Sequence, residues 1–290
     1  MTIYHLGKIE LFLLPVLFPK AKRIAARPAT DTAKKILAKL PKDETEFFYH
    51  FDVTFSDVWP AFRAELNSAL RARGIRIYNA NVTDISRKTL QAAIAAAGLP
   101  NLTAPRRGKP TERLIVKPDF NYRGLLDIEW NAKFPALFPR VPKAVKDYAV
   151  KERQDIPAAL WNAEGVQIER FISNPENKFF RVNLCQGRLV PGKYINPGLI
   201  KKPQQSIARW RFPGTTRNPE IARVVKLSKK VFRQMNVDFG TVDILSDVDG
   251  NLFVCDINST PYWGLPDSSI DKTKWTSEAT TNYLRDGTKP

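Results

Sequence analysis

The feature that most constrains this chain is a stretch near its C-terminal end, VDILSDVDGNLFVCDINSTP, from Val242 to Pro261. Two apolar runs are joined by Asp-Val-Asp-Gly-Asn at 247–251, a composition typical of a β-hairpin turn. Asp243, Asp256 and Asn258 nevertheless lie within the two predicted strands, where an unpaired carboxylate is costly to bury. The fold must therefore give these polar side chains a partner.

Strand alternation predicts which of these side chains lie together. Asp256 and Asn258 are two residues apart and should point to one face of the sheet, with Asp243 beside them on the paired strand. Two carboxylates and an amide oxygen are hard ligands that suit Mg²⁺ shared with nucleotide phosphates. An EF-hand is excluded, because placing Gly250 at the glycine position of its loop puts Leu245 at position one. The hairpin predicts a magnesium site, with a buried hydrogen-bond network as the alternative.

A second motif predicts a cation that could bind phosphates. The run RLIVKP, Arg113–Pro118, predicts a buried strand that ends on Lys117. The loop DFNYRG at 119–124 comes next and could fold over phosphates. Neither a Walker loop nor a Rossmann glycine motif occurs in the sequence, so any nucleotide site must be of another kind.

Periodicity and end signals predict the other elements. Helices are expected at 57–73, with Ser56 as its cap, at 85–97, and from Pro219 to about Met235, with Asn218 as its cap. Strands are expected at 75–80, 166–172 and 206–212, with a hairpin at 178–190 that turns at Gln186-Gly187 and a short helix at 156–165. The pattern predicts an α+β protein.

Composition indicates the cellular compartment and the kind of binding partner to expect. The chain has 290 residues, 46 Lys and Arg against 29 Asp and Glu, and a net charge of +17, which predicts attraction to anionic partners. Cys185 and Cys255 lie in apolar runs and are expected to be free thiols, which favours a reducing, cytoplasmic location. With two histidines, neither a zinc site nor a Ser-His-Asp triad is expected.

The N-terminal run IELFLLPVLF, Ile9–Phe18, is too short to span a membrane and is interrupted by Glu10 and Pro15. We expect a core strand followed by a basic segment. The alternative is peripheral contact of this basic N-terminus with an anionic membrane.

The order of IYNANVTDISRKTLQAAIAAAGLP, LIVKP, IERFI, FFRV and VDIL…DGN…VCDINSTP resembles the ATP-grasp superfamily. Within it, the chain is most similar to carboxylate–amine ligases such as glutathione synthetase and the ribosomal-protein glutamate ligase. The resemblance covers about Ala61 to Gly264. It implies two α+β lobes that enclose the nucleotide, preceded by a shortened α/β N-terminal domain. The implied division is 1–104 for the N-terminal region, 105–172 for the small lobe, 173–264 for the large lobe and 265–290 for a polar tail.

The resemblance also implies the roles of individual residues. ATP and Mg²⁺, or Mn²⁺ in its place, would be the nucleotide and the metal. The positions matching the family motifs are Lys88 and Lys117 for phosphates, Glu169 with the backbone of Arg170 and Ile172 for adenine, Glu176 for ribose, Arg181 for the reacting phosphate, and Asp243, Asp256 and Asn258 for metal. Two positions depart from the family pattern: Asp256 replaces the usual Glu, and FNYRG replaces a lid richer in Gly and Ser.

The reaction that the resemblance implies is activation of a carboxylate as an acyl phosphate, which an amine then attacks to form an amide. Lys202 and Arg209 lie in the basic segment GLIKKPQQSIARWRF, which predicts an anionic small-molecule, peptide or polymer substrate. Two alternatives stay open: a kinase on the same fold, and a non-catalytic binder of nucleic acid or anionic surfaces that uses Trp210 for stacking.

Overall fold

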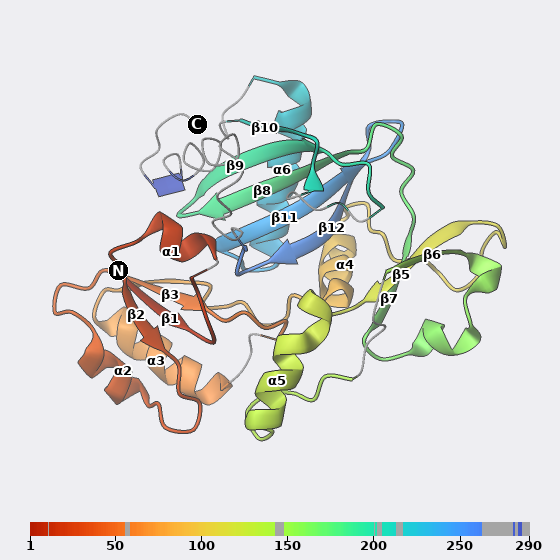
Figure 1. The fold of residues 1–290 in the computed structure, drawn as a ribbon. Coiled ribbons are helices and arrows are strands. Elements are labelled where there is room, and N and C mark those ends of the chain that lie inside the picture. The colour runs from red at the N-terminus through yellow and green to blue at the C-terminus, as the bar shows by residue number, and fades with distance from the viewer. Residues whose placement is uncertain are drawn as a thin grey trace.

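The computed structural model describes residues 1–10, 12–55, 59–142, 148–199, 201, 205–212, 217–262, 281 and 284–285. In these ranges the strands form a four-stranded N-terminal sheet, a five-stranded central sheet and a three-stranded sheet. Helices occur together with both parallel and antiparallel strand pairs, which confirms the predicted α+β class. Figure 1 shows the N-terminal sheet and the three-stranded sheet on different sides of the central sheet.

The N-terminal sheet is parallel, in the order β2-β1-β3-β4. Its strands are β1 (Thr2–His5), β2 (Lys22–Ala25), β3 (Glu46–His50) and β4 (Arg76–Tyr78). Helices α2 (Ala33–Lys39) and α3 (Pro60–Ala72) pack on one face, and α1 (Leu13–Leu17) packs on the other, where the central sheet also contributes to the core. The cap predicted at Ser56 lies outside the described residues.

The prediction of a strand at Ile9–Phe18 is wrong. The segment contains the short helix α1, which is buried between the N-terminal and central sheets. A segment that is apolar at most of its positions shows neither helical nor strand periodicity, so the sequence alone could not distinguish a helix from a strand here. The strand lies instead at Thr2–His5, ahead of the apolar run.

The central sheet is antiparallel, in the order β10-β9-β8-β11-β12. Its strands are β8 (Lys178–Cys185), β9 (Arg188–Ile195), β10 (Ala208–Arg211), β11 (Phe239–Ser246) and β12 (Leu252–Asn258). Helices α4 (Arg87–Ala96) and α6 (Pro219–Gln234) bury their apolar stripes on one face. Two local predictions are confirmed: Gln186 and Gly187 turn with φ of 49° and 80°, and the Asn218 side chain caps α6.

The three-stranded sheet has the order β6-β5-β7, from β5 (Arg113–Pro118), β6 (Ala149–Glu152) and β7 (Val166–Arg170). Between β5 and β6 the chain forms the 3₁₀ turn η1 (Asn121–Gly124) and helix α5 (Leu125–Lys133), which the sequence did not predict. Short turns η2 (Arg153–Asp155) and η3 (Ala158–Asn162) precede β7. The helix predicted at 156–165 is therefore a 3₁₀ turn, shorter than expected.

One buried side chain joins the N-terminal sheet to the central hairpin. Asn79, just after β4, accepts hydrogen bonds from the backbone N–H groups of Asp238 and Phe239, both at 3.0 Å. Its amide donates to the carbonyl oxygens of Phe239 and Ser259 at 2.9 and 3.3 Å. These bonds fix the end of β4 against the start of β11 and the end of β12, where the candidate site begins.

The C-terminal segment is described in part. Of the predicted tail at 265–290, the structure describes Thr281, Leu284 and Arg285, and Leu284 is fully buried. No helix within the described ranges has the length and apolar character needed to cross a membrane. Cys185 and Cys255 are free thiols, as expected.

Candidate active site

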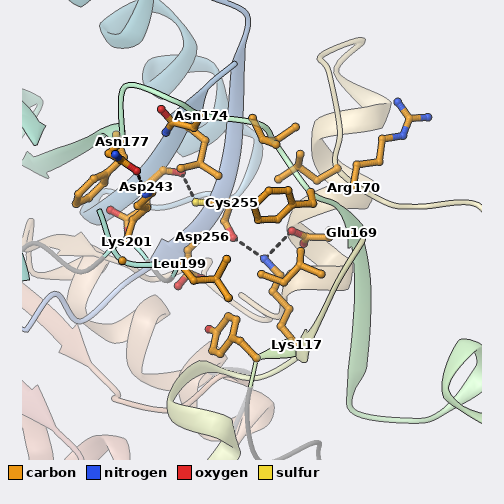
Figure 2. Close-up of a pocket in the computed structure, with 18 of the residues that line it drawn as sticks. Lys117, Glu169, Arg170, Asn174, Asn177, Leu199, Lys201, Asp243, Cys255 and Asp256 are labelled. Carbon is orange, nitrogen blue, oxygen red and sulfur yellow. Dashed lines mark hydrogen bonds and ion pairs between the residues drawn. The ribbon is translucent and has the colours of Figure 1, made fainter. Parts of the chain in front are cut away.

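A cavity of about 230 Å³ lies between the three-stranded sheet and the central sheet. Its wall combines residues of β5, β7, β11 and β12 with α4 and two loops, so segments far apart in the sequence meet there (Figure 2). The charged side chains in the wall are Arg87, Lys117, Glu169, Arg170, Lys201, Asp243 and Asp256. A solvent-accessible pocket that gathers this many charges is a candidate binding site.

Lys117 and Glu169 form a buried ion pair on neighbouring strands β5 and β7. The Lys117 Nζ lies 2.6 Å from Glu169 Oε2 and donates to the carbonyl oxygen of Cys255 at 3.1 Å. Burial raises the pKa of the Glu169 carboxyl, and the Lys117 ammonium opposes that rise. Glu169 Oε1 has no hydrogen-bond partner among the described residues. Figure 2 shows both side chains pointing toward Asp256 across the cavity.

Arg87, the first residue of α4, brings a cation to the opposite wall. Its guanidinium donates to the carbonyl oxygens of Pro118 and Phe120, each at 2.8 Å, to Tyr148 Oη at 3.0 Å and to Asp256 Oδ2 at 3.2 Å. Burial, the largest single effect, lowers the pKa of Arg87, but the surrounding groups, with Asp256 first and Tyr148 and Glu169 after it, together hold that pKa above its ordinary value. Arg87 is therefore a fixed positive charge.

Asp243 and Asp256 are direct cross-strand partners, on the adjoining strands that the hairpin pattern predicted. The pairing shifts after Asp243, so that Cys255 is an extra residue in β12, a β-bulge. Because of this bulge, Val254 and Ile257 both face the helices while Asp256 lies on the other face with Asp243. The bulge is thus what brings the two carboxylates to the cavity.

Arg181 on β8 holds Asp243 from the other side. Its Nε and Nη2 donate to the two carboxylate oxygens of Asp243, both at 2.7 Å, in a bidentate pair. Arg181 is not among the residues that line the cavity, but it contacts Asp243, which is. Each of the two cavity aspartates therefore has its own arginine.

Asn258 is oriented differently from the two aspartates. Its Oδ1 accepts the backbone N–H of Thr260 at 2.7 Å and lies 3.1 Å from the Thr260 hydroxyl. The Thr260 hydroxyl has one proton and lies closer to Asp52 Oδ1, at 2.8 Å, so the Thr260 N–H is the bond that orients the Asn258 oxygen. Asp243 and Asp256 can supply carboxylate ligands to a divalent cation, whereas Asn258 lies outside the cavity wall and would have to turn away from Thr260. Among the described residues, no three His, Cys, Asp or Glu side chains form a metal-binding group.

The remaining predicted residues divide between the cavity and the surface. Lys88 is exposed and lines a separate groove beside α4, while Glu176 is 69% exposed and pairs with Lys178 at 2.9 Å. Arg209 lies on β10 outside the cavity wall, where burial lowers the pKa of its guanidinium. Lys202 lies outside the described residues. Arg170 lines the cavity, and in Figure 2 its side chain extends away from the other charged groups.

Lys201 closes the wall near the loop after β9. Its Nζ donates to the carbonyl oxygen of Asn196 at 2.6 Å and to Asn177 Oδ1 at 3.3 Å, and burial lowers its pKa. Both partners are neutral, so the charge of Lys201 is available to an anion in the cavity.

The cavity thus contains Lys117, Glu169, Ile172, Asp243 and Asp256, which were predicted from the sequence, and also Arg87 and Tyr148, which were not. The signal for Arg87 was present, because Ser86-Arg87-Lys88 opens a predicted helix. Only packing decides which of the two adjacent cations faces inward, since they differ by about 100° around the helix axis.

The described site has several basic groups, each paired or hydrogen bonded, facing two carboxylates from one hairpin.

No protein-family model matches this chain, and no curated protein sequence matches it. Similar solved structures include the ATP-grasp ligase PsnB bound to a minimal precursor, at 13% identity over 96% of this chain and 98% of that chain, with a TM-score of 0.49. Another is the D-cycloserine synthetase DcsG, at 13% identity over 97% and 99%, with a TM-score of 0.43.

A third similar structure is the D-alanine–D-alanine ligase of Bacillus anthracis bound to ATP. It is 12% identical over 98% of this chain and 93% of that chain, with a TM-score of 0.46. The first of the three, PsnB, carries the name of the superfamily that the sequence motifs resemble. With such identities and TM-scores below 0.5, the activity of this chain has to follow from its own residues.

Proposed function

We propose that this protein is an ATP- and Mg²⁺-dependent carboxylate–amine ligase of the ATP-grasp type. The observation that carries the proposal is the cavity between two sheets, where Lys117, Arg87 and Lys201 face the aspartates of the β11–β12 hairpin. A triphosphate needs cations on its oxygens, and a divalent cation needs carboxylates. The cavity supplies both within one wall.

The ion pairs of the cavity can be exchanged for ligand contacts. Lys117 and Arg87 would turn their donors to phosphate oxygens, while Asp243 and Asp256 would hold Mg²⁺, joined by Asn258 once it releases Thr260. Bound Mg²⁺ would offset the negative charge of the terminal phosphates. Arg181, freed in part from Asp243, would stabilise the charge on the transferred phosphate. The buried pairs keep these groups in position before ligand arrives.

The other positions predicted from the sequence would complete the nucleotide site. Glu169 and the backbone of Arg170 and Ile172 would contact the adenine edge, and Glu176 the ribose. Lys88 would reach the phosphates only by crossing from its own groove, so Arg87 is the better candidate for that role. The proposed division into an N-terminal region, two lobes and a tail follows the boundaries predicted from the sequence.

The proposed reaction joins a carboxylate to an amine. Transfer of the γ-phosphoryl group to a carboxylate would give an acyl phosphate, and an amine would displace phosphate to form an amide. Lys202 and Arg209 would attract an anionic substrate to the cavity mouth. Walls from two sheets would exclude the water that competes with the amine.

Thermal unfolding with ATP and Mg²⁺ tests the nucleotide site. At ligand concentrations about 100 times Kd, the wild type should gain about 2.7 kcal/mol of stability, and Asp256→Ala should lose most of that gain. Asp249→Ala is the matched control, because Asp249 is exposed in the turn of the same hairpin. Equal stabilisation of both variants by ATP and Mg²⁺ would refute the site. Phosphate release that requires both a carboxylate and an amine distinguishes a ligase from a kinase.

A further inference from the structure

Asp52 is a half-buried carboxylate that pairs with no basic side chain among the described residues, in a protein that carries a net charge of +17. Its Oδ1 accepts the Thr260 hydroxyl at 2.8 Å, and its Oδ2 has no partner among the described residues. Removing a carboxylate from water without a counter-ion costs stability. A chain with so many Lys and Arg residues could readily have supplied one, so the missing cation calls for a functional explanation.

Asp52 lies just beyond a strand of the N-terminal sheet, at the kind of place where parallel sheets bind ligands. The strand order β2-β1-β3-β4 reverses its direction of winding at β1, with β2 on one side and β3 on the other. Ligands of open α/β sheets bind beyond the carboxyl ends of the strands at such a switch point. Asp52 follows the carboxyl end of β3, at His50, and so lies at this point.

A short chain of bonds connects Asp52 to the cavity. Strand β12 leaves the cavity at Asp256, reaches Asn258 after two residues, or about 6.6 Å, and then Thr260, whose hydroxyl contacts both Asn258 and Asp52. The carboxylate is thus connected through the Thr260 hydroxyl to Asn258, the last of the three proposed metal ligands, and lies beyond the residues that line the cavity. A second substrate that meets an activated carboxyl group there would lie against Asp52.

The surroundings of Asp52 favour a cation. Asp127 on α5 adds a second negative charge, and its own oxygens are held by the N–H groups of Thr54 and Phe55 and by the Thr54 hydroxyl. Burial, with Asp127 in support and the Thr260 hydrogen bond in opposition, raises the pKa of Asp52 to about 6. Such a group is an anion at neutral pH and a stronger base than an ordinary aspartate.

We propose that Asp52 binds the ammonium group of the amine substrate and accepts a proton from its nitrogen during amide formation. This role rests on the proposed ligase function. In the step, the amine nitrogen forms a bond to the carbonyl carbon of the acyl phosphate, the C–O bond to phosphate breaks, and phosphate leaves with the electron pair. An ammonium nitrogen loses two protons on becoming an amide: the first goes to Asp52 before the attack and then to solvent, and the second leaves with the phosphate. The ligand class is a primary amine that is protonated at neutral pH, such as an amino acid.

Asp52→Asn provides the test, with the exposed Asp43→Asn as the control on the same part of the fold. The probes are the twenty standard amino acids in pairs, with ATP and Mg²⁺, followed by phosphate release, and the same carboxylates with hydroxylamine, followed by hydroxamate formation. Hydroxylamine is uncharged at neutral pH and needs neither an ammonium site nor a strong base. We expect Asp52→Asn to lower kcat with amino-acid nucleophiles about 100-fold and to raise their KM, while hydroxamate formation stays within about twofold.

Stability provides the second readout. The variant should unfold at a higher temperature at pH 7 than the wild type, because a neutral amide replaces a buried charge without a partner. A merely structural Asp52 would give lower stability and an equal loss of both reactions, and that result would overturn the role. Unchanged amino-acid kinetics with normal hydroxamate formation would overturn the role of Asp52 alone. A wild type that forms no hydroxamate with any carboxylate would overturn the ligase proposal and this role with it.

Discussion

The Lys117–Glu169 pair allows the stability of the site to be separated from its function. The two side chains are 5% and 1% exposed, and their charged atoms are 2.6 Å apart. Lys117→Met keeps the length of the side chain and removes the charge, which leaves Glu169 buried without a counter-ion. Removing one partner of a buried pair costs about 3–5 kcal/mol, and we expect that loss in the free energy of unfolding at pH 7.

The loss should depend on pH with a defined sign. The folded-state pKa of Glu169 is already above its ordinary value of 4.5 because of burial, and it should rise further once Lys117 is removed. A raised acid pKa means that the folded protein binds a proton more readily than the unfolded chain. Lys117→Met should therefore lose less stability at pH 5 than at pH 7.

Urea unfolding of the single variant and of Lys117→Met with Glu169→Leu measures these effects. Replacing both partners by apolar groups removes the unpaired charge, so the double variant should recover to within about 1 kcal/mol of the wild type. It should still fail to gain stability from ATP and Mg²⁺, because the phosphate cation is gone. If the double variant is as unstable as Lys117→Met, the unpaired Glu169 charge is not the cause and the reasoning is refuted.

Two further predictions concern the junction and the buried histidine. Asn79→Ala should lower the free energy of unfolding by about 2–3 kcal/mol in urea titrations, because backbone groups at the start of β11 lose their partners; a change below about 0.5 kcal/mol would contradict this. His50 is fully buried, and burial lowers its pKa from 6.5 to about 3, so the unfolded chain binds its proton first as the pH falls below 6.5. The contribution of neutral His50 to the free energy of unfolding is therefore complete above pH 6.5 and decreases below that pH by up to about 1.4 kcal/mol per pH unit. His50→Leu should remove this dependence of the unfolding free energy on pH between pH 6 and 4. An unchanged dependence would exclude His50 as its source.

The sequence by itself determined the elements whose signals are local. The turn at Gln186-Gly187 and the cap at Asn218 were predicted correctly, and the end of β5 to within one residue, because turns, caps and strand ends depend on residues a few positions apart. The placement of Asp243 and Asp256 on adjoining strands of one hairpin was predicted for the same reason, but their direct pairing depends on the bulge at Cys255.

The tertiary structure decided which charges meet. Asp256 contacts Arg87, 169 positions away, and no local pattern indicates whether Arg87 or Lys88 faces inward. The bulge at Cys255, the turning of Asn258 toward Thr260 and the contact of Asp52 with Thr260 also depend on segments brought together by folding. A buried charge takes the partner that packing brings near, and that choice is made across the whole chain rather than along it.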